Sequence, residues 1–91
     1  MSERAKNVGS TIGAMRITIE LHGAFERLNP GAHPRRTLQV ASGVTVGDVL
    51  VAVGVDLHEP WNAALDGRLA GAADPVPEGS LLIVFSPVEG G

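Results

Sequence analysis

The chain has 91 residues, of which 44% are hydrophobic and 19% are charged, and its formal net charge is −3. This composition is typical of one small globular domain and excludes an intrinsically disordered chain. The absence of cysteine excludes disulfides, thiolate metal sites and cysteine nucleophiles, and a negative chain with one Trp and two Phe is unsuited to nucleic-acid binding.

The first residues, 1–14, are polar and small and show no sustained hydrophobic periodicity. We expect them to form a disordered tail before a folded domain over 15–87 and a flexible C-terminal segment over 88–91. The N-terminus lacks the apolar core of a signal peptide, and no apolar run approaches the roughly 18 residues that a membrane span needs. We therefore expect a cytoplasmic protein with no membrane partner.

Two segments in the first half of the domain alternate between apolar and polar residues, which is typical of strands with one buried face. In "RITIELH" the apolar residues are Ile17, Ile19 and Leu21. The second segment is "TLQVA", at 37–41. The connection between them holds two prolines and two glycines, so we expect a long loop that opens with a helical turn at 25–28.

The hydrophobic period changes to that of a helix in "VTVGDVLVAVGV". Thr45 is a natural N-cap, Asp48 completes a capping-box-like pair with it, and Gly54 suits the C-terminal cap. Because valine lowers helix propensity, we expect packing on a sheet to hold this helix. The apolar stripe consists of Val46, Val49, Leu50 and Val53.

The last third of the chain predicts a short hairpin and a final strand. Asp66-Gly67 permits a two-residue turn with positive φ. "LLIVF", at 81–85, is apolar on both faces, which is typical of a central strand covered on both sides. Two strands, a crossing helix and further strands with the last in the middle make an α+β fold, the β-grasp, with one main helix on one face of a mixed sheet. A ferredoxin-like sandwich is disfavoured because it needs a second helix.

The segment "VFSPVEGG" resembles the tail of the ubiquitin-like sulfur carriers. It is most similar to the tail of the small subunit of molybdopterin synthase, which typically reads Phe-Pro-Pro-Val-X-Gly-Gly. Ser86 stands where the first proline usually is. The thiamine-pathway carriers also end in Gly-Gly, but they are usually shorter and lack the Phe-X-Pro-Val segment. The residues that match are Phe85, Pro87, Val88, Gly90 and Gly91.

The resemblance extends over 15–91. "TVGDVL" resembles the family's helix start, and "PVPEGSLLIVF" resembles its last loop and strand. Three features depart from the family. Ser80 replaces a common acidic residue, the loop over 25–36 is long, and His22 stands near a position where the family often has an outward phenylalanine. The resemblance implies a ubiquitin-like fold and leaves the pathway open.

The resemblance also implies that the reactive group is the C-terminal carboxylate of Gly91. In the family, an adenylating partner enzyme uses ATP to convert this carboxylate into an acyl-adenylate, and sulfur then replaces the adenylate to give a thiocarboxylate. Val88, Glu89 and Gly90 would lead the carboxylate into the partner's channel, where glycine helps because it has no Cβ. Pro87 would stiffen the exit from the last strand. The chain itself would bind no cofactor, since the partner uses the ATP.

Strand parity predicts a partner interface. If Leu82 and Val84 face the helix, the alternate residues of the last strand face the other side of the sheet, where no second helix is expected. An open apolar patch of that kind marks a protein interface. By resemblance, Phe85 would contact both the adenylating enzyme and the large subunit of molybdopterin synthase. The predicted interface residues are Leu81, Ile83, Phe85, Pro87 and His22.

Other functions remain alternatives to a sulfur carrier. The three histidines lack metal-ligand spacing, so we expect no metal site, and no motif predicts an autonomous enzyme. A ubiquitin-like modifier would use the same tail to form isopeptide bonds with lysines of target proteins, and Lys6 is the only lysine of this chain. A carrier could also serve thiamine or another sulfur-containing metabolite. A plain β-grasp binding module would carry the two glycines without using them.

Overall fold

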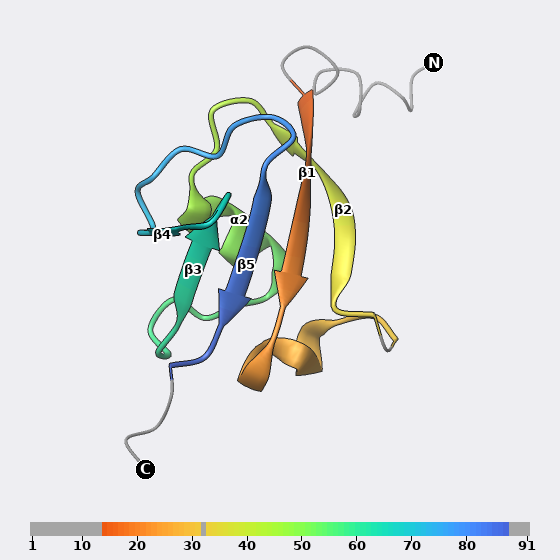
Figure 1. Ribbon diagram of the computed structural model, residues 1–91, viewed down its shortest axis with the longest axis vertical. Helices are drawn as coiled ribbons and strands as arrows, with labels where there is room; N and C mark the ends of the chain where they lie inside the picture. The colour runs from red at the N-terminus through yellow and green to blue at the C-terminus, as the bar shows by residue number, and fades with distance from the viewer. Residues whose placement is uncertain (1–13, 32, 88–91) are drawn as a thin grey trace.

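The computed structural model describes residues 14–31 and 33–87, in which five strands form one mixed sheet beside an α-helix and a 3₁₀ helix (Figure 1). Most of the predicted N-terminal tail and the predicted segment 88–91 lie outside the described residues. Both early strands begin two residues before their alternating patterns, β1 at Ala14 and β2 at Arg35. The elements are β1 (Ala14–Leu21), η1 (Gly23–Leu28), β2 (Arg35–Ala41), α2 (Val46–Val53), β3 (Asn62–Leu65), β4 (Arg68–Ala70) and β5 (Leu81–Phe85).

The strands lie side by side in the order β2-β1-β5-β3-β4. β5 pairs in parallel with β1, with Thr18 opposite Leu81 and Leu21 opposite Val84. The other three pairings are antiparallel. The last strand of the chain therefore lies in the middle of the sheet, and the predicted β-grasp arrangement is confirmed.

The helix α2 begins and ends where its capping residues predict. The Thr45 backbone N–H donates to Asp48 Oδ2 at 2.9 Å, and the Asp48 N–H donates to Thr45 Oγ1 at 3.2 Å, which completes a capping box. Gly54 closes the helix in the left-handed conformation, with φ +106°. Such caps stabilise a helix by about 1 kcal/mol each, which matters in an eight-residue helix rich in valine.

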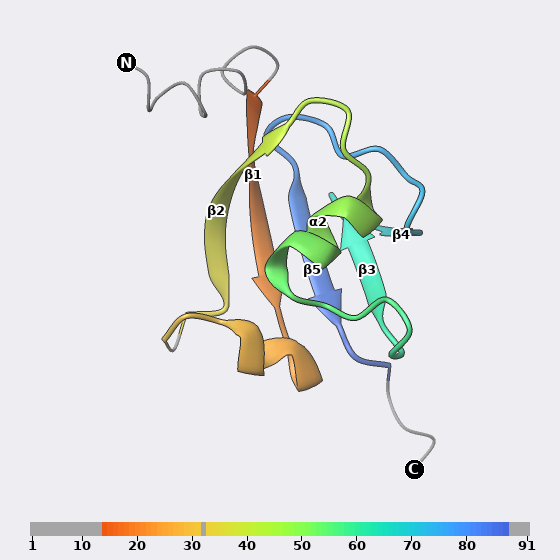
Figure 2. The ribbon, with the colours of Figure 1, turned by 180° about the vertical axis from the view of Figure 1, so that it is seen from behind.

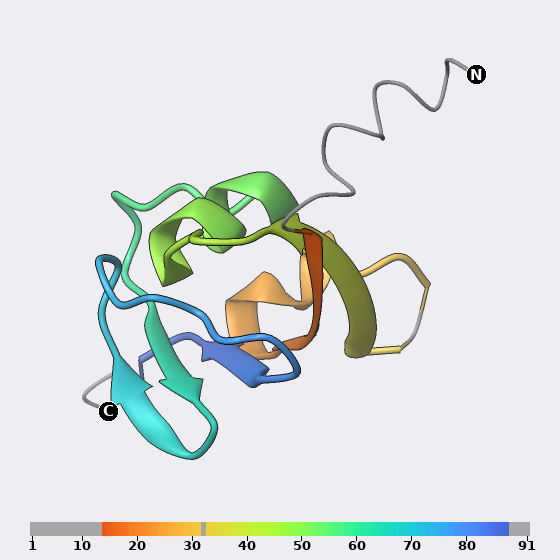
Figure 3. The same ribbon diagram turned by 90° about the horizontal axis from the view of Figure 1, so that it is seen from above.

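The core lies between the sheet and α2, which crosses one face of the sheet (Figures 2 and 3). The predicted inward residues of β1 are buried, as are Leu82 and Val84 of β5. Phe25 of η1 is also fully buried, so the 3₁₀ helix closes one end of the core. The largest fully buried side chains are Phe25, Ile17, Ile19, Leu21, Leu50, Leu82, Val46, Val49 and Val84.

The outer face of β5 differs from the prediction. The apolar side chains on both faces indicated a strand covered on both sides, and this is wrong. Leu81, Ile83 and Phe85 are only half-buried, and in the described residues no helix lies over that face (Figures 1 and 2). The sheet of a β-grasp needs only one covered face, because its antiparallel neighbours allow the other face to meet solvent or a partner.

The predicted hairpin joins β3 to β4. Asp66 and Gly67 have φ values of +50° and +88°, as a two-residue turn with two left-handed positions requires. This turn places Leu65 opposite Arg68 and Ala64 opposite Leu69. The hairpin therefore adds a short edge strand next to β3 and fixes which of its side chains point outward.

We expect Gly54→Ala to destabilise the domain by about 1–2 kcal/mol, because an L-residue in the left-handed region is strained. A Cβ at Gly54 would also lie 3.3 Å from Leu28 Cδ2. The measurement is the free energy of unfolding in urea. Gly71→Ala is the matched control, since a Cβ there meets nothing within 4 Å and its φ is not positive. Equal stabilities of the two variants would contradict the expectation.

Candidate functional site

The predicted interface residues of β5 share the outer face of the sheet. Leu81, Ile83 and Phe85 alternate with buried neighbours, as strand parity predicts. Each is half-buried, because the neighbouring strands cover the flanks of the side chain and leave its end accessible. These three residues form an apolar line along the central strand.

The end of β5 lies beside the end of β1. The backbone N–H of His22, the residue after β1, donates to the carbonyl of Val84 at 2.9 Å. On its other side, Phe85 is in register with Asn62 of β3. Pro87 is half-buried, so the structure brings His22, Phe85 and Pro87 to the point where the chain leaves the sheet (Figure 1). The remaining predicted site residues lie outside the described residues: Val88, Glu89, Gly90 and Gly91.

A row of side chains runs across all five strands on the outer face, and we call it the outer row. Ile83 of β5 is in register with Glu20 of β1 and Ala64 of β3. Glu20 is opposite Arg35 of β2, and Ala64 is opposite Leu69 of β4. Residues directly opposite each other point to the same face of a sheet. The outer row is therefore charged at the β2–β1 end and apolar from β5 to β4.

Sequence reasoning missed the β4 end of the outer row. The side chain of Leu69 is 78% exposed, more than any other large apolar residue in the described part of the chain. The turn at Asp66-Gly67 contained a signal, because counting outward from it pairs Ala64 with Leu69. The pairing of β3 with β5, which places this pair beside Ile83, had no local signal.

The charged end of the outer row is a hydrogen-bonded cluster. Glu20 Oε1 lies 2.8 Å from His22 Nε2, and Arg35 Nε donates to Glu20 Oε2 at 2.6 Å. Glu20 is the least exposed member, with 12% of its side chain accessible. The hydrogen bonds from His22 and then from Arg35 lower the pKa of Glu20 from its usual value, against a smaller opposing effect of burial. His22 is thus anchored by Glu20 at the border of the apolar line.

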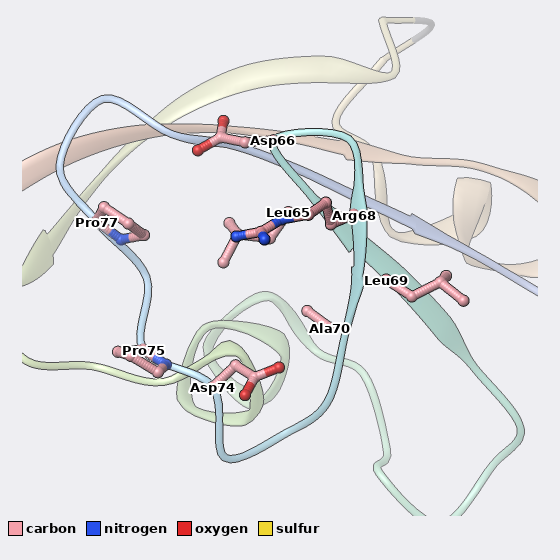
Figure 4. Close-up of a pocket in the computed structure, with 8 residues that line it drawn as sticks. All are labelled: Leu65, Asp66, Arg68, Leu69, Ala70, Asp74, Pro75 and Pro77. Carbon is pink, nitrogen blue, oxygen red and sulfur yellow. The ribbon is translucent and has the colours of Figure 1, made fainter.

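A hollow of about 470 Å³ lies elsewhere, between the β3–β4 hairpin and the loop that precedes β5 (Figure 4). Asp66 and Asp74 line it, and each carboxylate accepts a hydrogen bond from a backbone N–H, at 2.9 and 2.8 Å. The Arg68 side chain extends into it (Figure 4). None of the predicted site residues lines this hollow, so it is separate from the candidate site.

Two further classes of site were sought in residues 14–31 and 33–87. Within these ranges, no group of three or more His, Asp or Glu side chains is placed to hold a metal ion. No described helix is long and apolar enough to cross a membrane. What the described residues do offer is a flat contact surface beside the exit of the C-terminal segment.

No protein-family model matches this sequence, and no curated protein matches it. Among solved structures, the chain is similar to the HVO 2177 protein of Haloferax volcanii, with a TM-score of 0.71 and 26% identity over 87% of this chain and 89% of that one. It is also similar to the small archaeal modifier protein 1 of the same organism, with a TM-score of 0.67 and 19% identity over 81% of this chain and 99% of that one.

A third similar structure is a Pyrococcus furiosus protein described as subunit 1 of a molybdopterin converting factor. The TM-score is 0.64, and the identity is 18% over 81% of this chain and 99% of that one. At such identities, structural likeness shows a shared fold. The chain therefore has the ubiquitin-like β-grasp fold, with the mixed sheet and single main helix of these neighbours.

We expect Glu20→Gln to destabilise the domain at pH 7 by roughly 1 kcal/mol or less, because it removes a partly exposed ionic cluster. Since the folded-state pKa of Glu20 is lowered, its carboxylate stabilises the domain at pH values above the unfolded pKa. That contribution is lost as the pH falls through the folded pKa, which lies below 4.5.

Urea unfolding of the wild type and the variant across this pH range measures the effect. The difference between them should shrink at acidic pH. Glu26→Gln, the same substitution at an exposed position of η1, should change stability by less than about 0.5 kcal/mol. A difference that is constant with pH would contradict the assignment to the Glu20 charge.

Proposed function

We propose that the chain is a sulfur carrier that is adenylated and then thiocarboxylated at Gly91. We further propose that it acts as the small subunit of molybdopterin synthase in the cytoplasm. The observation that carries the proposal is the position of β5. The central strand of a ubiquitin-like sheet ends at Phe85, and Pro87 and the Val-Glu-Gly-Gly sequence follow it directly. A terminal carboxylate attached in this way extends from the most firmly held strand of the domain.

The chemistry needs little from this chain beyond that carboxylate. A carboxylate oxygen of Gly91 attacks the α-phosphate of ATP on the partner enzyme, which forms the acyl-adenylate and releases pyrophosphate. A sulfur nucleophile then displaces AMP to give the thiocarboxylate. Its sulfur is ionised at neutral pH and is a good nucleophile, as a cysteine thiolate is. The chain thus acts as a co-substrate, and the partner provides the ATP site and the catalytic groups.

The outer face is the proposed docking surface for the partners. Leu81, Ile83 and Phe85 present apolar side chains next to the exit of the C-terminal segment. An enzyme that holds this face would have Gly91 within reach, since five extended residues after Ser86 span at most about 17 Å. The proposed partners are an adenylating enzyme and the synthase large subunit, with neither nucleic acid nor membrane.

The second candidate function is protein modification. Small archaeal modifier protein 1 resembles this chain as much as the converting-factor subunit does, with TM-scores of 0.67 and 0.64. Those names support a carrier or a modifier and do not choose between them. A modifier would pass the same activated carboxyl group to a lysine amine. A carrier for thiamine or another sulfur-containing metabolite, or a binding module that does not use its glycines, would leave the described residues unchanged.

The test of the proposed function is the intact mass of the purified chain after incubation with ATP, a sulfur source and the cognate adenylating enzyme. We expect a gain equal to one exchange of oxygen for sulfur, confined to the C-terminal peptide. A variant that lacks Gly91 should show no gain. Conjugates to lysines in a lysate that resist reductant would indicate the modifier instead. An unchanged mass with an active enzyme would reject both activities.

A second prediction concerns the docking surface. Leu69→Glu should raise the KM of the adenylating enzyme for this chain at least about fivefold, because it places a charge at the apolar end of the outer row. Val51→Glu is the matched control, since Val51 is also exposed, at 59%, but lies on α2, on the opposite face of the sheet. The control should leave KM within about twofold of the wild type. Equal effects of the two variants would remove Leu69 from the interface.

A further inference from the structure

The residue that follows β5 makes an unusual long-range hydrogen bond. The Ser86 hydroxyl oxygen accepts the backbone N–H of Ala24 at 3.2 Å, although the two residues are 62 positions apart in the sequence. Ala24 is the second residue of η1, and Ser86 is the first residue after the central strand. The bond therefore ties the start of the C-terminal segment to the start of the 3₁₀ helix.

This hydroxyl takes the place of a helix cap. The first N–H groups of a helix have no partner within it and are usually satisfied by the side chain of the N-cap residue. The N-cap of η1 is His22, whose side chain makes no capping hydrogen bond and lies instead beside Glu20. Ser86 supplies the missing acceptor from the opposite end of the domain sequence. Its position next to η1 is therefore favoured by a specific interaction.

Gly23 makes the close approach possible. It has φ +64°, and a Cβ built on it would overlap the Ser86 hydroxyl oxygen. Only glycine satisfies both requirements, the left-handed conformation and the empty space. The N–H of His22 bonds to Val84 on the same side, so consecutive residues of the β1–η1 junction hold alternate residues at the end of β5.

The chain changes character immediately after Ser86. Pro87 has no N–H to donate and its ring fixes φ near −65°. Among the described residues, Ser86 is the last that makes a hydrogen bond to another described residue. The direction in which the chain leaves the domain is consequently set by Ser86 together with the stiff Pro87.

From this geometry we infer that the Ser86 hydroxyl is a positioning group for the C-terminal segment. The inference rests on the proposed function and adds to it how the segment is aimed at a partner. A segment whose first residue is held loses less conformational entropy when a partner's channel binds it. Ser86 touches no reacting atom, so it should act on binding of the chain and not on the chemical step.

The first test uses the chain alone. Ser86→Ala should speed hydrogen exchange of the Ala24 amide about fivefold, the loss expected for one hydrogen bond. Ser86→Thr keeps the hydroxyl and should keep the protection. Gly23→Ala should displace Ser86 and expose the same amide. Unchanged exchange in all three variants would overturn the bond as a feature of the protein in solution.

The second test separates binding from chemistry. With the cognate adenylating enzyme, Ser86→Ala should raise KM about fivefold and leave kcat unchanged, and Ser86→Thr should restore KM. Ser80→Ala is the matched control. Ser80 stands directly before β5, is buried, and donates its hydroxyl to the Pro77 carbonyl at 2.6 Å. Its loss should lower stability without changing KM.

The outcomes distinguish the inference from the function on which it rests. Normal KM in Ser86→Ala with faster Ala24 exchange would mean that the hydroxyl caps η1 but positions nothing. An equal rise of KM in Ser80→Ala would assign the effect to stability and would also overturn the inference. No adenylation of the wild type would reject the proposed function and the positioning role together, while the exchange data would still report the hydrogen bond.

Discussion

The parallel pairing of β1 with β5 is the constraint on which the rest of the molecule depends. These are the first and last strands of the domain, and a parallel pair can form only after the intervening chain has crossed over. Leu21 and Val84 are opposite each other in this pair, and both are fully buried. Once β5 is fixed between β1 and β3, the placement of its outward side chains and of its end follows without further interactions.

One sheet thereby carries two kinds of surface, because side chains alternate along each strand. The inward side chains are fully buried with α2 and Phe25, and each large one contributes about 1.5–3 kcal/mol by its removal from water. The outward side chains are only half-buried, so their identity affects stability less and leaves more freedom for recognition. The charged pair Glu20–Arg35 at one end gives this face an orientation, since a partner must match charge at one edge and apolar surface at the other.

Elements with local signals could be predicted from the sequence. The helix was predicted by its apolar stripe and by the Thr45–Asp48 box, and the hairpin by Asp66-Gly67, because those interactions join residues a few positions apart. Alternation along "LLIVF" predicted which residues face the helix. It could not predict the cover of the opposite face, since an apolar side chain reads the same under a helix as on an open surface.

The parts that were missed depend on residues far apart in the sequence. The place of Leu69 at the end of the outer row requires the register of β3 on β5 as well as the hairpin. The contact of Glu20 with Arg35 requires the register of β1 on β2. The bond from Ala24 to Ser86 requires η1 and β5 to meet, and a serine in place of the proline of the resembling family gave no indication of a partner.

The parallel arrangement of β1 and β5 also decides how the protein can be handled. Two parallel strands have their starts at one edge of a sheet and their ends at the other, so Ala14 and Phe85 lie at opposite ends of the domain (Figure 1). A fluorophore, an affinity tag or a surface tether attached before β1 is therefore held away from the exit of the C-terminal segment. The domain can be immobilised through its N-terminal side with that exit facing the solution.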